Sequence, residues 1–317
     1  MLGLRLQIFL ILTVFALAIV SARAVVPAAS TTNTALGAGT TIVLLHGLGG
    51  SSRDWHQTAE RLAAHHRVVM LDLPGHGQSR MPEPFSLEAA AASLDRALAG
   101  IPGGPVILVG HSLGGLVAAA EASEHPERIR GLILVEAALR PQIPEEQRAG
   151  LLDRLEGDYP AVLHDAYLSF GRDSAQGGML ARRAATFDPQ MMRRWIRLAW
   201  AAEVTEQVTR LGVPVLAVLS ERSWAAAEPW EVVADSLGYA GVSRLRATRV
   251  PDCGHFIMLD QPARLAAIVA GFAARPEGLN VVMLPARGTA PAWAAWSAPA
   301  PPPGFAAWAP SPRSRPS

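Results

Sequence analysis

The sequence predicts an α/β fold: a mostly parallel sheet with helices on both faces and a helical insertion. Three observations support this prediction. Short apolar runs rich in Val, Ile and Leu alternate with segments of helical pattern, as in strands buried on both faces. One such run ends in a Gly-X-Ser-X-Gly turn at residues 110–114 and continues into a helix. Half of the 317 residues are hydrophobic, enough for a large core.

The predicted elements alternate along most of the chain. Strands are expected at residues 41–45, 68–71, 106–109, 132–135, 215–219 and 245–250. Helices are expected at residues 52–64 with Ser52 as N-cap, 86–99, 116–123, 230–237 and 263–274. Residues 141–210 break the alternation, because they have a helical pattern, many Arg and Trp residues, and no strand. We therefore predict a core of residues 25–140 and 211–275, with residues 141–210 as a lid over the catalytic edge.

Both ends of the chain differ from this core. Residues 1–24 are typical of a cleaved signal peptide, with Arg5 before an apolar stretch and Ala22-Arg23-Ala24 as a cleavage pattern. The apolar stretch falls short of the roughly 20 residues that span a bilayer. We therefore expect an exported protein, periplasmic or secreted, without a stable membrane anchor after cleavage. Residues 276–317 are rich in Pro, Ala and Trp and are predicted to be disordered.

Composition excludes several classes of function. A net charge of +1 gives no reason to expect nucleic acid as a partner. All basic residues are Arg, so chemistry that needs a lysine, such as a Schiff base or a phosphate-binding loop, is excluded. Cys253 is the single cysteine and cannot form an internal disulfide. The histidines show no spacing typical of a zinc site, so no metal and no cofactor are predicted.

Ser112 is the candidate nucleophile. A sharp turn from strand to helix places the central side chain at its apex, and Gly110 and Gly114 avoid clashes there. The free N–H groups of the helix N-terminus lie beside the serine oxygen. A serine hydroxyl is a weak nucleophile and needs a base within hydrogen-bond reach.

Four motifs make the chain similar to the α/β-hydrolase fold family from about residue 40 to 275. They are His-Gly-Leu-Gly-Gly at 46–50, Asp-Leu-Pro-Gly-His-Gly-Gln-Ser at 72–79, the serine turn, and Gly-His-Phe-Ile-Met-Leu-Asp-Gln-Pro at 254–262. The chain before His46 has little strand pattern, so the opening antiparallel hairpin of the family is expected to be reduced. A serine at the apex disfavours the reactions of relatives that use an aspartate there.

The resemblance implies that His255, after the last strand, is the base. The position where most relatives carry the acid holds Ser223, which cannot serve. A minority of relatives carry the acid one strand earlier, where this chain has Glu136 at the end of an apolar strand. A carboxylate there is costly to bury unless it is paired, for example with an imidazolium. We expect Glu136 to be the acid, with Glu221 second and Glu228 third.

The resemblance also implies an oxyanion hole made by the backbone N–H groups of Leu113 and Leu48. The expected reaction is hydrolysis of a small or medium carboxylic ester through an acyl-enzyme on Ser112. Trp195, Trp200 and the Met191-Met192 pair of the lid are candidates for an apolar acyl pocket. Hydrolysis of a carbon–carbon bond and cofactor-free perhydrolysis use the same residues. A protein that binds a small ligand without turnover is the alternative outside enzymes.

Overall fold

The computed structural model describes residues 34–77 and 79–277, which lie within the first of two compact units, residues 1–283. The predicted signal peptide, and residues 278–317 of the predicted tail, lie outside this part of the chain. Both assignments, and export with them, stay predictions. Among the described residues, no helix is both long enough and apolar enough to cross a membrane.

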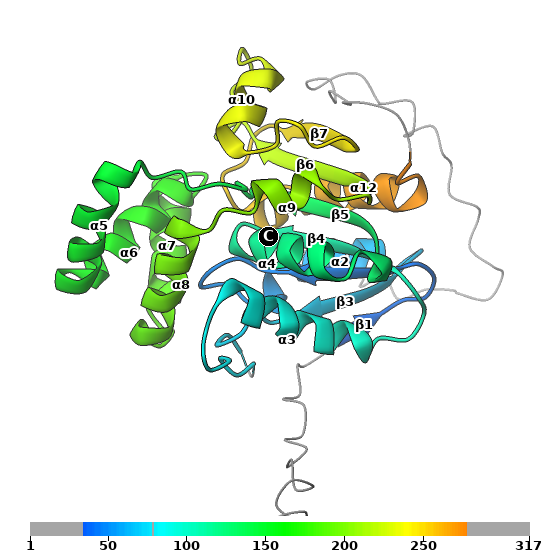
Figure 1. Ribbon diagram of the computed structural model, residues 1–317, viewed down its shortest axis with the longest axis horizontal. Coiled ribbons are helices and arrows are strands. Elements are labelled where there is room, and N and C mark those ends of the chain that lie inside the picture. Colours follow the sequence, from blue (N-terminus) through cyan, green and yellow to red (C-terminus); the bar gives the residue numbers. More distant parts are fainter. Residues whose placement is uncertain (1–33, 78, 278–317) are drawn as a thin grey trace, which may run out of the picture. The chain divides into compact units, whose positions relative to one another are not determined.

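A seven-stranded sheet runs through the centre of this unit in the order β1-β3-β2-β4-β5-β6-β7 (Figure 1). Its strands are β1 (Thr34–Leu36), β2 (Thr41–Leu45), β3 (Arg67–Leu71), β4 (Val106–His111), β5 (Ile129–Val135), β6 (Val215–Ser220) and β7 (Leu245–Val250). All neighbouring strands are parallel except β1, which pairs antiparallel with β3. Strands β2, β4 and β6 are buried at every position, because helices cover both faces, and this explains their continuous apolar runs.

Helices from outside the insertion cover the sheet. The α-helices outside the insertion are α2 (His56–Leu62), α3 (Leu87–Ala99), α4 (Leu113–Glu124), α10 (Trp230–Leu237), α11 (Ile257–Asp260) and α12 (Pro262–Ala274), and two 3-10 helices are η1 (Ser52–Trp55) and η2 (Pro126–Arg128). Helix α3 packs against α4, and α2 packs against α12. The fold class predicted from the sequence is confirmed. The described part of the chain begins with β1, which has three residues, and the expected reduction of the opening hairpin stays a prediction.

The predicted start of the first helix was wrong in detail. The N-cap is Ser51, not Ser52, and a short 3-10 helix precedes α2. Ser51 has an extended backbone, and its N–H donates to Asp54 Oδ2 at 3.2 Å. Ser51 and Asp54 form a capping box, which marks the start of the helix locally. Ser52 lies inside the first turn, and its N–H donates to Asp72 Oδ1 at 2.7 Å.

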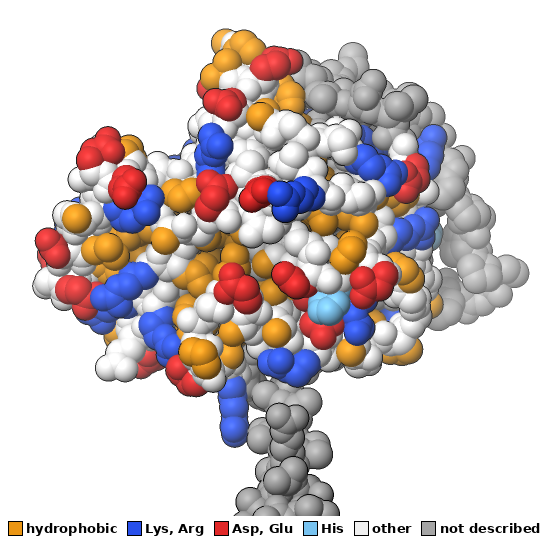
Figure 2. All heavy atoms as spheres, viewed as in Figure 1, with side chains coloured by type: hydrophobic (Ala, Val, Ile, Leu, Met, Phe, Trp, Pro, Cys, Tyr) orange, Lys and Arg blue, Asp and Glu red, His pale blue; other side chains and the backbone are white. Residues whose placement is uncertain are grey.

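The insertion between β5 and β6 is helical, as predicted. It contains α5 (Glu145–Gly157), α6 (Tyr159–Phe170), α7 (Ser174–Ala184), α8 (Pro189–Ala201) and α9 (Thr205–Thr209). Figure 1 shows α5 to α8 as a group beside the sheet. On the face drawn in Figure 2, acidic and basic side chains are interspersed, in keeping with the near-neutral net charge.

Candidate active site

Ser112 lies between β4 and α4 in a strained conformation. Its φ of 51° and ψ of −120° place it in a region that costs a non-glycine residue about 1–3 kcal/mol. Its N–H donates to Val135 O of the neighbouring strand at 2.9 Å, which holds the turn against the sheet. A Cβ at Gly110 would lie 2.4 Å from Gly114 O, and one at Gly114 would lie 2.3 Å from His46 O. Only glycine fits at these two positions, as the motif requires.

His255 and Glu136 meet although 119 residues separate them. His255 lies in the loop between β7 and α11, and Glu136 directly follows β5. The distance from His255 Nδ1 to Glu136 Oε2 is 3.0 Å. The Glu136 side chain is fully buried and that of His255 is 12% exposed. A carboxylate held at Nδ1 keeps the proton on that nitrogen and leaves Nε2 as the basic one.

Two further donors hold the Glu136 carboxylate. Ser220 N–H donates to Oε1 at 2.5 Å, and Ser223 Oγ donates to Oε2 at 2.9 Å. Glu136 itself has a φ of 51°, so its backbone turns sharply at the end of β5. In the sequence, Ser223 stands out only as the residue at the position where most relatives carry the acid. The structure places its hydroxyl on the Glu136 carboxylate, at the oxygen that also contacts His255 Nδ1.

The two other acid candidates lie elsewhere. Glu221 is exposed, and neither Glu221 nor Glu228 is part of the cavity wall that holds His255. The structure therefore brings Glu136, and not these two residues, to the imidazole.

A cavity of about 710 Å³ brings the predicted site residues together. Its wall includes Ser112, His255, Glu136, Leu48 and Leu113. Within the described residues, no hydrogen bond joins Ser112 Oγ to the His255 ring. Such bonds are often long in unliganded enzymes and shorten when substrate binds.

The rest of the cavity wall is mainly apolar. Helices α6 and α8 contribute Val162, Leu163, Ile196 and Trp200. Trp200 thus lines the cavity as expected, whereas Trp195 and the Met191-Met192 pair are buried outside its wall. The arginines that line the cavity are Arg140 and Arg222.

The two predicted oxyanion donors lie on adjacent backbone segments. Leu113 is the first residue of α4, and the first N–H groups of a helix have no partner within it. Leu48 lies in the loop after β2. A Cβ at Gly47, next to Leu48, would lie 3.1 Å from Ser112 Cβ, so this loop passes directly beside the serine.

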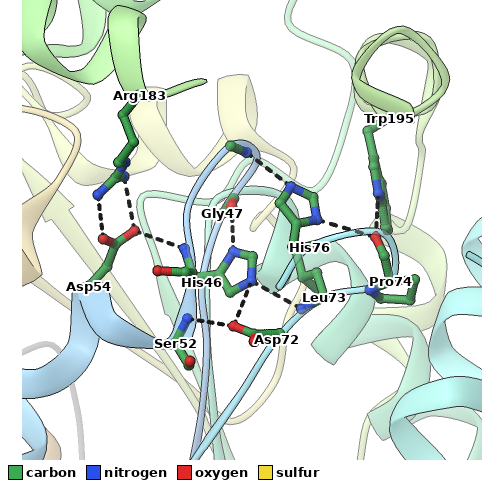
Figure 3. Close-up of polar contacts among 12 residues, drawn as sticks. His46, Gly47, Ser52, Asp54, Asp72, Leu73, Pro74, His76, Arg183 and Trp195 are labelled. Atoms are coloured by element: carbon green, nitrogen blue, oxygen red, sulfur yellow. Dashed lines mark hydrogen bonds and ion pairs between the residues drawn. The ribbon is translucent and has the colours of Figure 1, made fainter. Parts of the chain in front are cut away.

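Three buried histidines support the loops around Ser112. Burial lowers the pKa of His46 to about 4 and that of His76 to about 3, and it lowers the pKa of His111 well below its ordinary value. All three rings are therefore neutral at pH 7. His111 Nε2 lies 2.9 Å from His255 O, and this contact fixes the backbone of His255. Figure 3 shows the contacts of His46 and His76 with the loops after β2 and β3.

One group of possible metal ligands occurs among the described residues, on α3, α4 and the turn after α4. Ligand atoms of Asp95, Glu121 and His125 all lie within 4.8 Å of one another. Arg128 Nε lies 3.0 Å from Asp95 Oδ1, so this group already has a cation beside it. None of these residues lines the cavity at Ser112.

The fold and the site together define a class of hydrolases: a mostly parallel sheet carries a serine on a strained strand-to-helix turn, with a paired histidine and carboxylate beside it. A family model described as "Alpha/beta hydrolase family" matches residues 42–268. This chain therefore belongs to the α/β hydrolase family and is an enzyme of that family.

Individual relatives agree with this assignment. A pimeloyl-[acyl-carrier protein] methyl ester esterase from Yersinia enterocolitica is 31% identical over 192 residues, which are 56% of this chain and 72% of the relative. A hydrolase from Oleispira antarctica matches the fold with a TM-score of 0.67 at 18% identity, covering 78% of this chain and 96% of the other. An esterase from Thermogutta terrifontis matches with a TM-score of 0.62 at 24% identity, covering 78% and 93%. At these identities the two structures show the fold alone.

Proposed function

We propose that this protein is a serine esterase that hydrolyses carboxylic esters of small to medium size. Ser112 is the nucleophile, His255 the base and Glu136 the acid that orients it. The backbone N–H groups of Leu48 and Leu113 form the oxyanion hole. One observation carries the proposal: the His255–Glu136 pair, at 3.0 Å, lies in the same cavity wall as Ser112 and both amides.

The reaction would proceed in two steps. Ser112 Oγ attacks the ester carbonyl while His255 Nε2 takes its proton, and the carbonyl oxygen becomes an oxyanion between the two amides. His255 then gives this proton to the departing alkoxide as the carbon–oxygen bond breaks. A water molecule, deprotonated by His255 Nε2, then attacks the acyl carbon. The bond from this carbon to Ser112 Oγ breaks, the acid leaves, and His255 returns the proton to Oγ. Glu136 stabilises the imidazolium that forms in both steps.

The cavity supports an ester with an apolar acyl chain. Its volume of about 710 Å³ falls within the range of small-molecule sites, and its wall is mainly apolar. The relative from Yersinia enterocolitica is named for a methyl ester as substrate. We further propose that the insertion at residues 141–210 acts as a lid, because α6 and α8 supply much of the apolar wall. Export to the periplasm or medium belongs to the same proposal and rests on residues 1–24 alone.

The test combines a covalent probe with a panel of substrates. A fluorophosphonate probe is expected to label the wild-type protein at Ser112 and not to label Ser112→Ala or His255→Ala. p-Nitrophenyl esters of graded acyl length are expected to be hydrolysed by the wild type and not by Ser112→Ala. An unlabelled, inactive wild-type protein would favour a binding protein. Probe labelling without ester turnover would favour carbon–carbon bond hydrolysis, to be measured on a 1,5-diketone substrate. A peroxide-dependent gain in product would favour perhydrolysis.

A further inference from the structure

One peptide group of the oxyanion loop is held at both of its polar atoms. Tyr167 OH, from α6, donates to Leu48 O at 2.6 Å. The N–H of the same peptide group, that of Gly49, donates to His76 Nε2 at 3.1 Å. The group between Leu48 and Gly49 is therefore fixed by two side chains from distant segments, and it cannot rotate without breaking one of these bonds. The N–H of Leu48 belongs to the preceding peptide group, which is joined to the fixed group at the Leu48 Cα.

The environment of Gly49 shows how closely Tyr167 approaches. Gly49 has a φ of +61°, and a Cβ there would lie 2.3 Å from Tyr167 OH. The tyrosine ring is stacked on Phe256, the neighbour of His255, with centroids 6.2 Å apart. Burial raises the pKa of Tyr167 well above its ordinary value, so the hydroxyl stays a donor. Ring packing and the absence of a side chain at Gly49 together place this hydroxyl on the loop.

The second contact requires one tautomer of His76. Because Nε2 accepts the Gly49 N–H, the proton must be on Nδ1, which lies 3.2 Å from Pro74 O (Figure 3). Trp195 Nε1, from α8, donates to the same carbonyl at 2.9 Å. Figure 3 shows Trp195 and His76 meeting at this oxygen. Helix α8 of the insertion thus contacts the same carbonyl oxygen as His76, the residue that holds the Gly49 N–H.

A third helix of the insertion contacts η1, the 3-10 helix that follows this loop. Arg183, from α7, forms two hydrogen bonds with the Asp54 carboxylate, at 2.5 and 3.0 Å (Figure 3). Helices α6, α7 and α8 each contact a different segment of the core: Leu48 in the loop after β2, Asp54 in η1 and Pro74 in the turn after β3. These three contacts tie the insertion to the core beside this loop.

We propose that Tyr167 is a positioning residue for the oxyanion hole, and that it couples the seating of the insertion to the orientation of the Leu48 amide. This inference rests on the proposed esterase function. Tyr167 also lines the cavity, but its hydroxyl is bonded to Leu48 O, so we assign its role to the Leu48–Gly49 peptide group. Its contribution belongs to the transition state, in which charge develops on the carbonyl oxygen.

The test replaces Tyr167 by Phe, which keeps the ring and removes the hydroxyl. Loss of one hydrogen bond is expected to lower kcat on p-nitrophenyl butyrate about tenfold, with KM within about twofold of wild type. A trifluoromethyl ketone, which forms a charged tetrahedral adduct with Ser112, should lose affinity by the same factor as kcat/KM. The matching carboxamide, which stays planar, should bind unchanged. Incorporation of p-aminophenylalanine at position 167, which again supplies a donor, should restore kcat.

Tyr159 supplies a matched control on the same helix. It is buried, its ring lies under Arg193, and its hydroxyl has no hydrogen-bond partner in the part of the chain described. Tyr159→Phe is therefore expected to match wild type in kcat, KM and both inhibitors.

Other outcomes would overturn the inference. They are an unchanged kcat in Tyr167→Phe, an equal loss of affinity for both inhibitors, or a variant that does not fold. The last would show that the hydroxyl serves stability instead. Failure of the proposed function is distinguishable, because wild type would then be inactive or Ser112→Ala would remain active in the same assay.

Discussion

Glu136→Gln is expected to lower kcat/KM on an activated ester by about three to four orders of magnitude, the scale observed when the acid of a serine triad becomes an amide. The size of the effect follows from the hydrogen bonds of the carboxylate. Ser220 N–H lies 2.5 Å from Oε1 and can only donate, so the amide oxygen must take this position. The amide nitrogen then occupies the place of Oε2, which lies 3.0 Å from His255 Nδ1.

Two N–H groups cannot face each other at that distance, so His255 must move its proton from Nδ1 to Nε2. In this tautomer Nε2 already carries a proton and cannot take the one from Ser112. Ser223 can adapt, because a hydroxyl at 2.9 Å accepts as readily as it donates. The fold should therefore tolerate the substitution while the reaction does not, and the variant should melt close to the wild-type temperature.

The assay is hydrolysis of p-nitrophenyl butyrate, with the rate of fluorophosphonate labelling at Ser112 as a second readout. Glu221→Gln is the matched control, because Glu221 is an exposed glutamate that follows the neighbouring strand and lies outside the cavity wall. It should retain wild-type activity. A large loss in Glu221→Gln together with an active Glu136→Gln would refute the assignment of the acid.

Two further substitutions test a hydrogen bond to Glu136 and a buried carboxyl group in the core. Ser223→Ala should lower kcat/KM only about two- to tenfold, because Glu136 loses one donor but keeps Ser220 and His255; a loss as large as that of Glu136→Gln would contradict this. Glu121 is fully buried in α4, and burial and the nearby Asp95 raise its pKa to about 7. The folded chain thus holds the Glu121 proton more tightly than the unfolded chain does. The stability that this protonation contributes is complete below the usual glutamate pKa, and it is lost as pH rises through about 7. Glu121→Gln should therefore raise the melting temperature more at pH 8.5 than at pH 5 in thermal unfolding followed by fluorescence, and an equal shift at both pH values would argue against it.

The fold was predictable because its signals are local. Strands buried on both faces are mainly apolar, so β2 was placed at its observed bounds and β3, β4, β5 and β6 within a few residues. The edge strand β7 was also placed at its observed bounds, although it is only partly buried. The N-cap of the first helix was predicted one residue too late, although Ser51 and Asp54 have the spacing of a capping box in the sequence.

The site was predictable only in part. Ser112 and His255 stand in motifs whose spacing follows from the strand-to-helix turn and from the last loop of the sheet. The carboxylate partner of His255 had three candidates in sequence, and the fold brings Glu136 to the ring. Tyr167 had no recognisable pattern, because its partner Leu48 lies 119 residues away and the contact exists only once α6 is seated.

The amino-acid sequence by itself determined the class of fold, the alternation of strands and helices, and the turn that carries Ser112, since each depends on residues close together along the chain. Only the tertiary structure decided which carboxylate meets His255 and which side chains hold the loop after β2. These contacts join segments far apart in sequence, and a hydrogen bond depends on where both partners finally lie in space.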